Sequence, residues 1–548
     1  NGDQVTASDF VWAWERMLTP SLGSKYPDML YDVVNAEEFN KVHSSCGAKE
    51  NPCDGHVTFS VEANNDSTIT VTDISKSGTN YLVRRQFEGK AEKNGFVTFR
   101  SAKSLGGNIT AEVLNQEYQI ASIISENVYT IEAKDVDGNL VKINSQDIGE
   151  GGSKVTTAYR SLKDFTKVGV KSLGMKKLLV ELKNPAPYFL GLLAHYTTRP
   201  VHRPTIEKFG EIDTIGSKWT RPGNFIGNGP FTLEDWQLNK VLKVKKNNLY
   251  WDANRVRLNG IHFFPVDNAT REDLMFRNGQ LHVTSTVPLE KIEVYSKQYP
   301  DLIHIDPYFG TYYLRINVNK APFDNKLVRK ALSLSINRKE IVEKVAKGGQ
   351  IPAFSFTPPD PNSYFPPTKL EFDPVLAQSL MKEAGVSQEK LPAFEYLYNT
   401  SEGHQKLAQA FQQMWKENLN IDVELANTDW KVYLSRQNIG DYTIARAGWI
   451  GDYPDPKTFL DMMVSDRGNN QTGWSNYEYD NLLIKAAQST SQEERFKHFY
   501  KAEQILMDEL PIIPIYTYTR VYMLNKDVKG WSPNLLDSHP YQFVYLER

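Results

Sequence analysis

A twelve-residue stretch of this sequence, from Ala445 to Pro456, carries side chains that can bind a ligand but form no nucleophile–base pair. It reads Ala-Arg-Ala-Gly-Trp-Ile-Gly-Asp-Tyr-Pro-Asp-Pro. Asp452 offers a carboxylate to an ammonium group, Arg446 offers a guanidinium to a carboxylate, and Trp449 supplies an apolar wall. Because a zwitterion carries both of the complementary charges, this stretch favours capture of a ligand over catalysis.

Motifs for catalysis are missing from the rest of the sequence. It contains no Gly-x-Ser-x-Gly elbow, no His-Glu-x-x-His zinc motif and no phosphate-binding loop of the Walker type. Asp452 and Asp455 could be taken as a carboxylate pair for glycoside hydrolysis. However, Pro454 and Pro456 make the segment a rigid turn, which Asp455 is better placed to stabilise. We therefore expect a binding protein that is not an enzyme and uses no cofactor.

Length and composition narrow the class further. A chain of 548 residues predicts about three domains. The net charge of -3 argues against a nucleic-acid-binding protein, which would carry a basic surface. Aromatic residues make up 12% of the chain and suit a pocket that accepts varied side chains. Since no run of 18 apolar residues occurs, we expect no membrane-spanning segment.

The two cysteines, Cys46 and Cys53, are separated by turn-forming residues that would let them meet. We expect a structural disulfide between them, which would indicate an oxidising compartment. A metal site that also uses His43 and His56 is one alternative, and a pair of free thiols is another.

The chain changes character twice. Residues 1–40 are expected to be mainly helical, with a helix over 9–18 that Ser8 or Asp9 caps. Residues 44–160 show alternating runs typical of strands, listed here as 56–61, 67–71, 96–99, 127–132 and 140–143. The last two flank Asp137-Gly138, a hairpin signal. Strands and helices alternate from Pro288 to about Leu510, for example a strand over 394–398 before a helix over 404–418, and a further strand follows Pro514.

Further motifs follow one another along the chain. They are Asn1–Phe10 with Trp14-Glu15-Arg16, Asn228–Phe231 with Trp236, Asn248–Asp252, Tyr312-Tyr313 to Asn317, Lys320–Phe323, Val328–Leu332, Tyr398–Ser401 with His404, Trp430 and Pro514–Tyr516. Together with 445–456, their types and order resemble the oligopeptide-binding proteins (solute-binding protein family 5), the extracytoplasmic solute-binding subunits of bacterial peptide transporters. The resemblance covers roughly 1–40 and 168–548.

The resemblance implies a fold of the α/β class, the type II periplasmic-binding-protein fold, with two hinged lobes and three domains. In the family only a short connection replaces the β-rich stretch, which we therefore interpret as an inserted subdomain. The expected divisions are 1–43 with 161–176 for the small domain of the first lobe, 44–160 for the insert, 177–285 with 519–548 for the main part of the first lobe, and 286–518 for the second lobe. A long surface insert of this kind costs little closure entropy.

The resemblance also implies a function. The protein would capture short peptides in a cleft that closes between the lobes and deliver them to the membrane permease of an ABC transporter. We expect a monomer, no nucleic-acid partner, and a place in the periplasm or on the outer face of the cytoplasmic membrane. The family also implies a segment before Asn1 that carries an export signal or lipid anchor. One alternative is a narrower binding protein for dipeptides or cell-wall peptides, and another is an envelope adhesin or scaffold that acts through 44–160.

Ten residues are carried over or proposed as ligand contacts. Asp452 would receive the peptide's terminal ammonium, while Gly448 and Ile450 would pair with its backbone like a neighbouring strand. The remaining candidates are Arg446, His404 and Lys320 for the terminal carboxylates of peptides of different length, Trp449 and Trp430 as pocket walls, Asn399 as a pocket amide, and Arg436 as a charge-balancing contact.

Overall fold

The computed structural model describes residues 2–44, 57–62, 66–73, 91, 93–125, 127–153, 155–359, 364–367, 370–386, 393–465 and 469–547. Cys46 and Cys53, with the disulfide predicted for them, lie outside these residues. The chain divides into two compact units: Asn1–Gln4 with Pro185–Tyr196 and Lys218–Arg548, and Val5–Asn184 with Thr197–Ser217. Within the described residues, no helix has both the length and the apolar character needed to cross a membrane.

The second of these units begins with helix α1 (Ala7–Leu18), whose buried face includes Trp14 and Leu18. Its cap differs from the prediction. Thr6 is the N-cap, and its backbone N–H donates to the Asp9 carboxylate at 2.7 Å. Asp9 lies at the third helical position and reaches back in a capping box, so the helix starts before Ser8. Around it lie α2 (Ala36–Asn40), β8 (Val170–Ser172), β9 (Leu178–Val180) and α6 (Arg203–Lys208).

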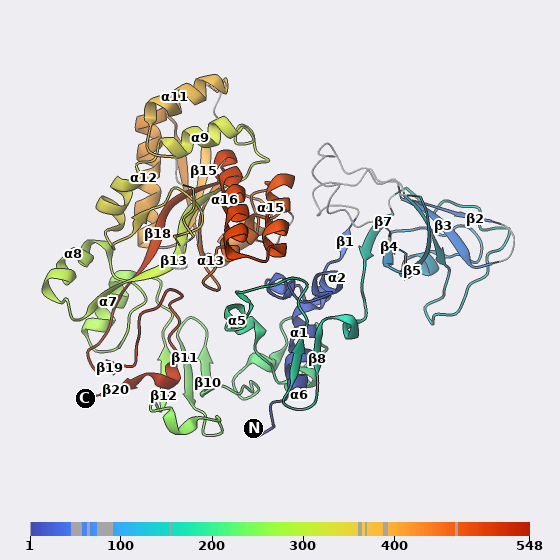
Figure 1. Cartoon of the computed structure of the whole chain (residues 1–548), viewed down its shortest axis with the longest axis horizontal. Coiled ribbons are helices and arrows are strands. Elements are labelled where there is room, and N and C mark those ends of the chain that lie inside the picture. The colour runs from blue at the N-terminus through green and yellow to red at the C-terminus, as the bar shows by residue number, and fades with distance from the viewer. Residues whose placement is uncertain are drawn as a thin grey trace. The chain divides into compact units, whose positions relative to one another are not determined.

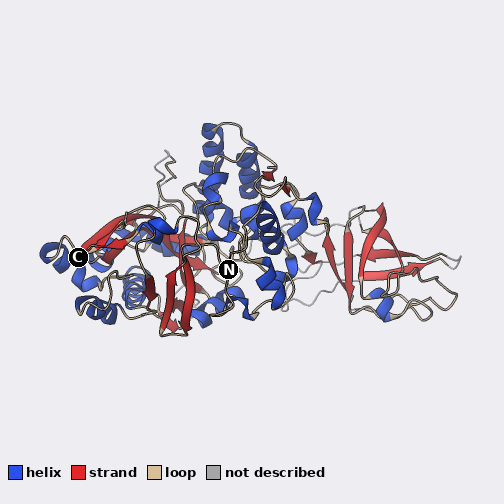
Figure 2. Ribbon diagram, turned by 90° about the horizontal axis from the view of Figure 1, so that it is seen from below, coloured by secondary structure: helices blue, strands red, loops and turns tan. Residues whose placement is uncertain are grey.

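The same unit contains a seven-stranded sheet in the order β1-β7-β4-β5-β6-β3-β2 (Figures 1 and 2). Its elements are β1 (His43–Ser44), β2 (Val57–Val61), β3 (Thr68–Asp73), β4 (Phe96–Arg100), α4 (Ala111–Leu114), β5 (Glu117–Ser125), β6 (Val128–Glu132) and β7 (Thr156–Arg160). Inward-facing residues such as Phe99, Tyr129 and Ile131 form its own core. The predicted strand over 140–143 is wrong: Leu140 makes only an isolated bridge to Lys134, because the Asp135 carboxylate organises the intervening turn.

A six-stranded sheet forms the centre of the other unit, in the order β14-β18-β13-β17-β15-β16. Its strands are β13 (Ile303–Ile316), β14 (Ile351–Pro352), β15 (Phe394–Asn399), β16 (Val423–Thr428), β17 (Ile444–Ile450) and β18 (Ile512–Met523). One face packs on α9 (Lys326–Leu334), α11 (Pro374–Glu383) and α12 (Glu402–Leu419), and the other on α14 (Lys457–Leu460), α15 (Tyr477–Gln488) and α16 (Gln492–Glu509). Figure 1 shows α12 and α16 on opposite sides of these strands. The predicted strand at 394–398 and helix at 404–418 are confirmed.

The rest of this unit supports the sheet. It comprises α5 (Phe189–Leu192), the three-stranded sheet β10 (Phe231–Gln237), β11 (Val241–Lys246) and β12 (Gly260–Phe263), then α7 (Ala269–Arg277), α8 (Leu289–Gln298), α10 (Arg338–Glu340), α13 (Trp430–Asn438), β19 (Val528–Lys529) and β20 (Tyr545–Leu546). Helix α13 lies next to Leu397 and Ala445, so it covers the part of the sheet that carries β15 and β17.

A buried carboxylate ties α16 to the segment that follows β14. Glu503 is fully buried and accepts hydrogen bonds from the Thr357 backbone N–H at 2.6 Å and the Tyr364 hydroxyl at 2.7 Å. Burial raises the pKa of Glu503 to about 7, although the Thr357 and Tyr364 hydrogen bonds oppose the shift. The folded protein therefore holds a proton here that the unfolded chain releases at lower pH.

This linkage predicts how stability depends on pH. A raised carboxyl pKa favours the folded state at low pH, and this contribution is lost as the pH rises from about 4.5 to about 7. We expect Glu503→Gln to remove this dependence of the unfolding free energy on pH. Between about pH 4.5 and about pH 7, the unfolding free energy of the wild type should therefore fall by about 2–3 kcal/mol more than that of the variant. Urea unfolding at several pH values measures it. The exposed Glu424→Gln variant is the control, and parallel profiles for Glu503→Gln and the wild type would contradict the prediction.

Candidate functional site

Strand β17 displays three of the predicted site residues on one face. Arg446, Gly448 and Ile450 are spaced two apart, so their positions face the same side of the sheet. Their partners on β13 are Leu314, Tyr312 and Gly310, respectively. Tyr312 also lies opposite Tyr516 of β18. The register therefore places Arg446 and the side-chain-free Gly448 near tyrosines of β13 and β18.

The Arg446 guanidinium is surrounded by phenol rings. It lies 5.4 Å from the centre of the Tyr312 ring, and its Nη2 is 3.4 Å from the Tyr518 hydroxyl oxygen. The Tyr433 hydroxyl donates to the Arg446 backbone carbonyl. Arg446 Nε is buried without a hydrogen-bond partner, and no carboxylate of the described residues forms an ion pair with this side chain. A buried cation in such a setting favours an anionic partner.

His404 lies beside this arginine, in the first turn of α12. Its ring centre is 5.8 Å from that of Tyr312. Burial, together with the positive charge of Arg446, holds the pKa of His404 well below its ordinary value. The imidazole is therefore neutral near pH 7 and can donate one hydrogen bond without adding charge.

Gly448 is a point of close approach. A Cβ atom built there would lie 2.3 Å from the Tyr518 hydroxyl oxygen. The Tyr518 ring therefore covers the Gly448 backbone and spans the short distance to Arg446. A larger residue at this position would have to displace the ring.

Asp452 follows β17 directly, after Gly451. Its backbone N–H donates to Thr458 Oγ1 at 3.0 Å, and the Thr458 hydroxyl lies 3.4 Å from Asp452 Oδ2. The side chain is 15% exposed, and Oδ1 lies 3.5 Å from His195 Nε2. Strand β17 thus carries the Arg446 guanidinium near its start, and the Asp452 carboxylate follows its last residue.

The turn after Asp452 is held from two sides. Tyr453 stacks on Tyr188 with 5.5 Å between the ring centres. Asp455 forms a bidentate, buried ion pair with Arg495, with bonds of 2.6 and 2.8 Å, which agrees with its expected role in stabilising the turn. A cavity of about 630 Å³ lies beside this turn, lined by Pro185–Tyr188, Gly191, Tyr453–Asp455, Ser489–Gln492, Arg495 and Phe496.

The other predicted site residues are more scattered. Trp449 points to the opposite face of the sheet, against the α14–α16 core, and its buried Nε1 lacks a partner among the described residues. Asn399 ends β15, and its buried Oδ1 also lacks one. Trp430 is 54% exposed and stacks on Tyr433. Ligand contact by each of the three stays a prediction.

The two remaining cations lie apart from Arg446. Arg436 forms ion pairs with Glu395 at 2.7 Å and Asp441 at 2.8 Å, so its charge is balanced inside the protein. Lys320 lies in the turn between β13 and α9, where Phe323 N–H donates to its carbonyl. The described contacts do not bring Lys320 into the Arg446 cluster.

Three residues near the predicted site were not identified as ligand contacts from the sequence. Tyr312 belongs to a motif that supports the resemblance, and Tyr518 lies in the strand expected after Pro514, but neither pattern indicates a ligand contact. His195 carries no sequence signal, because it is a single histidine outside every motif of the chain. Only the fold places it beside Asp452.

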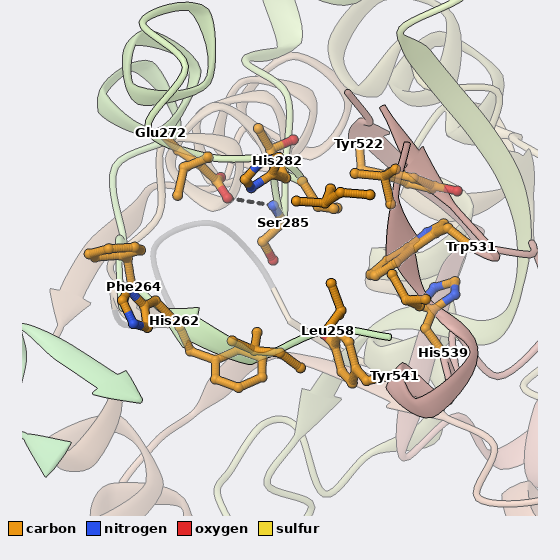
Figure 3. Close-up of a pocket in the computed structure, with 18 of the residues that line it drawn as sticks. Leu258, His262, Phe264, Glu272, His282, Ser285, Tyr522, Trp531, His539 and Tyr541 are labelled. Carbon is orange, nitrogen blue, oxygen red and sulfur yellow. Dashed lines mark hydrogen bonds between the residues drawn. The ribbon is translucent and has the colours of Figure 1, made fainter. Parts of the chain in front are cut away.

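A second cavity, of about 640 Å³, lies elsewhere in the same unit (Figure 3). Two of its carboxylates already have protein partners: Glu272 accepts from the Ser285 backbone N–H, and Asp537 contacts both Arg520 and His539. None of the predicted site residues lines it. The charges around this cavity therefore do not match the zwitterion that the sequence predicts.

Comparison with known proteins identifies the family. The model for bacterial extracellular solute-binding proteins, family 5, matches residues 130–471. The chain is 34% identical over 392 residues to the periplasmic oligopeptide-binding protein OppA of Salmonella typhimurium, which covers 70% of each chain. It is also 34% identical over 374 residues to the periplasmic murein peptide-binding protein MppA of Escherichia coli, covering 67% of this chain and 68% of that one.

A solved structure agrees with these matches. Haemophilus influenzae OppA, in complex with RPPGFSPFR, superposes with a TM-score of 0.73 at 26% sequence identity, covering 100% of this chain and 85% of that one. The resemblance inferred from the motifs and the expected type II periplasmic-binding fold are thereby confirmed. This chain belongs to the bacterial extracellular solute-binding proteins of family 5.

Proposed function

We propose that this protein captures short peptides in extended form and passes them to the permease of an ABC transporter. The observation that carries the proposal is the Arg446 guanidinium, which is buried among tyrosines without a carboxylate partner in the described residues. A peptide's terminal carboxylate would supply the missing charge, with the neutral His404 as a second donor. Asp452, at the end of the same strand, would receive the terminal ammonium.

The spacing of these groups supports a peptide of a few residues. Arg446 and Asp452 are six positions apart, and an extended chain advances about 3.3 Å per residue. Their Cα atoms are thus separated by at most about 20 Å, and both side chains shorten the gap. A peptide of about three to five residues, extended over about 10–17 Å, would bridge it. Gly448 and Ile450 would pair with its backbone, which gives affinity without reading its sequence.

The setting and domain divisions follow the family. As a member of an extracellular family, the chain works outside the cytoplasmic membrane. We propose the divisions 1–43 with 161–176, 44–160, 177–285 with 519–548, and 286–518. The seven-stranded sheet between His43 and Arg160, with its own core, supports treating 44–160 as an insert. Similarity to a murein peptide-binding protein favours a cell-wall peptide as the second candidate ligand.

Native mass spectrometry of protein purified without denaturation tests the proposal. We expect a mixture of co-purified peptides of about three to five residues, whose release leaves a protein that rebinds added trialanine. Free alanine is the matched control, because it is too short to bridge both charges. A single co-purified species would indicate the narrower ligand. An empty protein that ignores trialanine and pentaalanine would contradict peptide capture.

A further inference from the structure

The carboxylate proposed to receive a ligand's ammonium already faces a basic side chain of the protein. His195 Nε2 lies 3.5 Å from Asp452 Oδ1, and the two side chains are only 9% and 15% exposed. His195 belongs to the 185–196 segment that contains α5, whereas Asp452 follows β17. Two stretches far apart in the sequence therefore meet at the proposed position of the ligand's terminal ammonium.

The 185–196 segment is anchored beside Asp452 by a second contact. The Tyr188 ring stacks on Tyr453 at 5.5 Å, with an angle of 16° between the ring planes. Arg495 lies 4.9 Å and Lys457 5.3 Å from the centre of the Tyr188 ring. This aromatic and cationic packing holds the 185–196 segment against the turn and so keeps His195 near Asp452.

The charged groups around this turn are divided among different partners. Lys457 pairs with Asp461 at 2.5 Å, and Arg495 pairs with Asp455 at 2.6 Å. The α14 side of Asp452 presents the uncharged Thr458 hydroxyl, and the Tyr196 ring lies against the His195 imidazole at 4.1 Å. Lys457 and Arg495 thus each contact a carboxylate other than Asp452, while His195 lies 3.5 Å from Asp452.

We propose that His195 is an internal substitute for the ligand's terminal ammonium, which occupies Asp452 in the empty site and is displaced when a peptide binds. The inference rests on the proposed peptide-binding function and adds a specificity-determining residue to it. Because only a protonated imidazole forms a full ion pair with the carboxylate, the competition strengthens as the pH falls through the range in which histidine gains a proton. Capture of free-amine peptides is then weakened at acidic pH.

The loss of affinity at acidic pH depends on the fraction of protein molecules in which His195 pairs with Asp452. If a protonated His195 holds about nine tenths of the Asp452 carboxylates, the apparent affinity for an ammonium ligand falls about tenfold. A neutral His195 holds few of them, so the effect disappears at alkaline pH. A ligand without an ammonium group does not compete for Asp452 and is unaffected.

Calorimetric titration of wild type and His195→Gln with trialanine tests this inference. At about pH 5.5, we expect the variant to bind trialanine about tenfold more tightly than the wild type, and at about pH 8 the two Kd values should agree within about twofold. N-acetyl-trialanine should bind both proteins equally at each pH. In an Asp452→Asn background, His195→Gln should have no effect. The exposed His262, replaced by glutamine, is the matched control and should leave the pH profile unchanged.

Three other outcomes would overturn the inference. Weaker binding by His195→Gln at the acidic pH would mean that His195 supports the ligand instead of competing with it. Equal affinities at both pH values would mean that His195 does not compete at all. These two results leave peptide capture intact, whereas a wild-type protein that binds no trialanine at either pH would remove the proposed function and this inference together.

Discussion

Replacement of Asp452 by asparagine is expected to weaken binding of free-amine peptides about 100- to 1000-fold, or about 3–4 kcal/mol. Asparagine keeps the size of the side chain and an oxygen that can face Thr458, so the turn should persist. What it removes is the charge that would balance the terminal ammonium inside a closed site, where water cannot replace it. Titration with trialanine measures the loss.

The test has two controls that separate charge pairing from damage to the fold. An N-acetylated peptide has no ammonium, so its affinity should change little between the wild type and Asp452→Asn. Asp422→Asn removes a surface carboxylate that pairs with Lys416 at 2.9 Å, and a surface pair contributes at most about 1 kcal/mol. An unchanged trialanine Kd in Asp452→Asn would exclude Asp452 from the site.

Much of the fold follows from local patterns. The strands at 57–61, 96–100 and 394–399 show the alternation or β-branched and aromatic content that favours sheet, and the structure contains them. Leu140–Ile143 shows the limit of this reasoning. Its pattern also suits a strand, but the Asp135 carboxylate accepts two backbone N–H groups of the turn. Side-chain to backbone bonds of this kind compete with a regular ladder.

Part of the site was also predictable, because the residues that matter are close together in the sequence. Arg446, Gly448 and Asp452 lie on one strand and the turn after it, so a period of two already places the first two on the same face. The side chains that surround Arg446 were not predictable in this way. Tyr312 and Tyr518 come from β13 and β18, and only the strand order and register bring them next to β17.

Charge partners were the least predictable feature. The sequence offers Arg446 and Arg436 as similar cations ten positions apart, yet their surroundings differ. Arg436 meets Glu395 from β15 and Asp441 from the loop after its own helix, whereas Arg446 meets phenol rings. Which arginine is left for a ligand thus depends on the tertiary neighbours. A residue's type and spacing do not reveal them.

This difference leads to the second large expected effect. Arg446→Met should weaken binding of peptides with a free terminal carboxylate about 100-fold or more, or about 3 kcal/mol, because the carboxylate would enter a buried site without its cation. A C-terminally amidated peptide should lose far less. The Arg255→Met variant is the matched control. Arg255 is exposed, and its Nε lies 3.6 Å from the Asp252 carboxylate, so its replacement should leave peptide binding unchanged.

The same variant separates a binding arginine from a structural one. If Arg446 served the fold, its removal would lower the unfolding free energy of the empty protein. We expect the opposite, because Arg446 is a buried cation without a carboxylate partner in the described residues, and methionine fills a similar volume without a charge. The variant should therefore be at least as stable as the wild type while it binds peptide poorly.

The pKa of His404 should also rise in Arg446→Met, since Arg446 contributes to holding it down, and an NMR titration of the His404 ring would detect the change. Loss of stability together with an unchanged His404 titration would assign Arg446 to the core and leave the terminal carboxylate without its proposed partner.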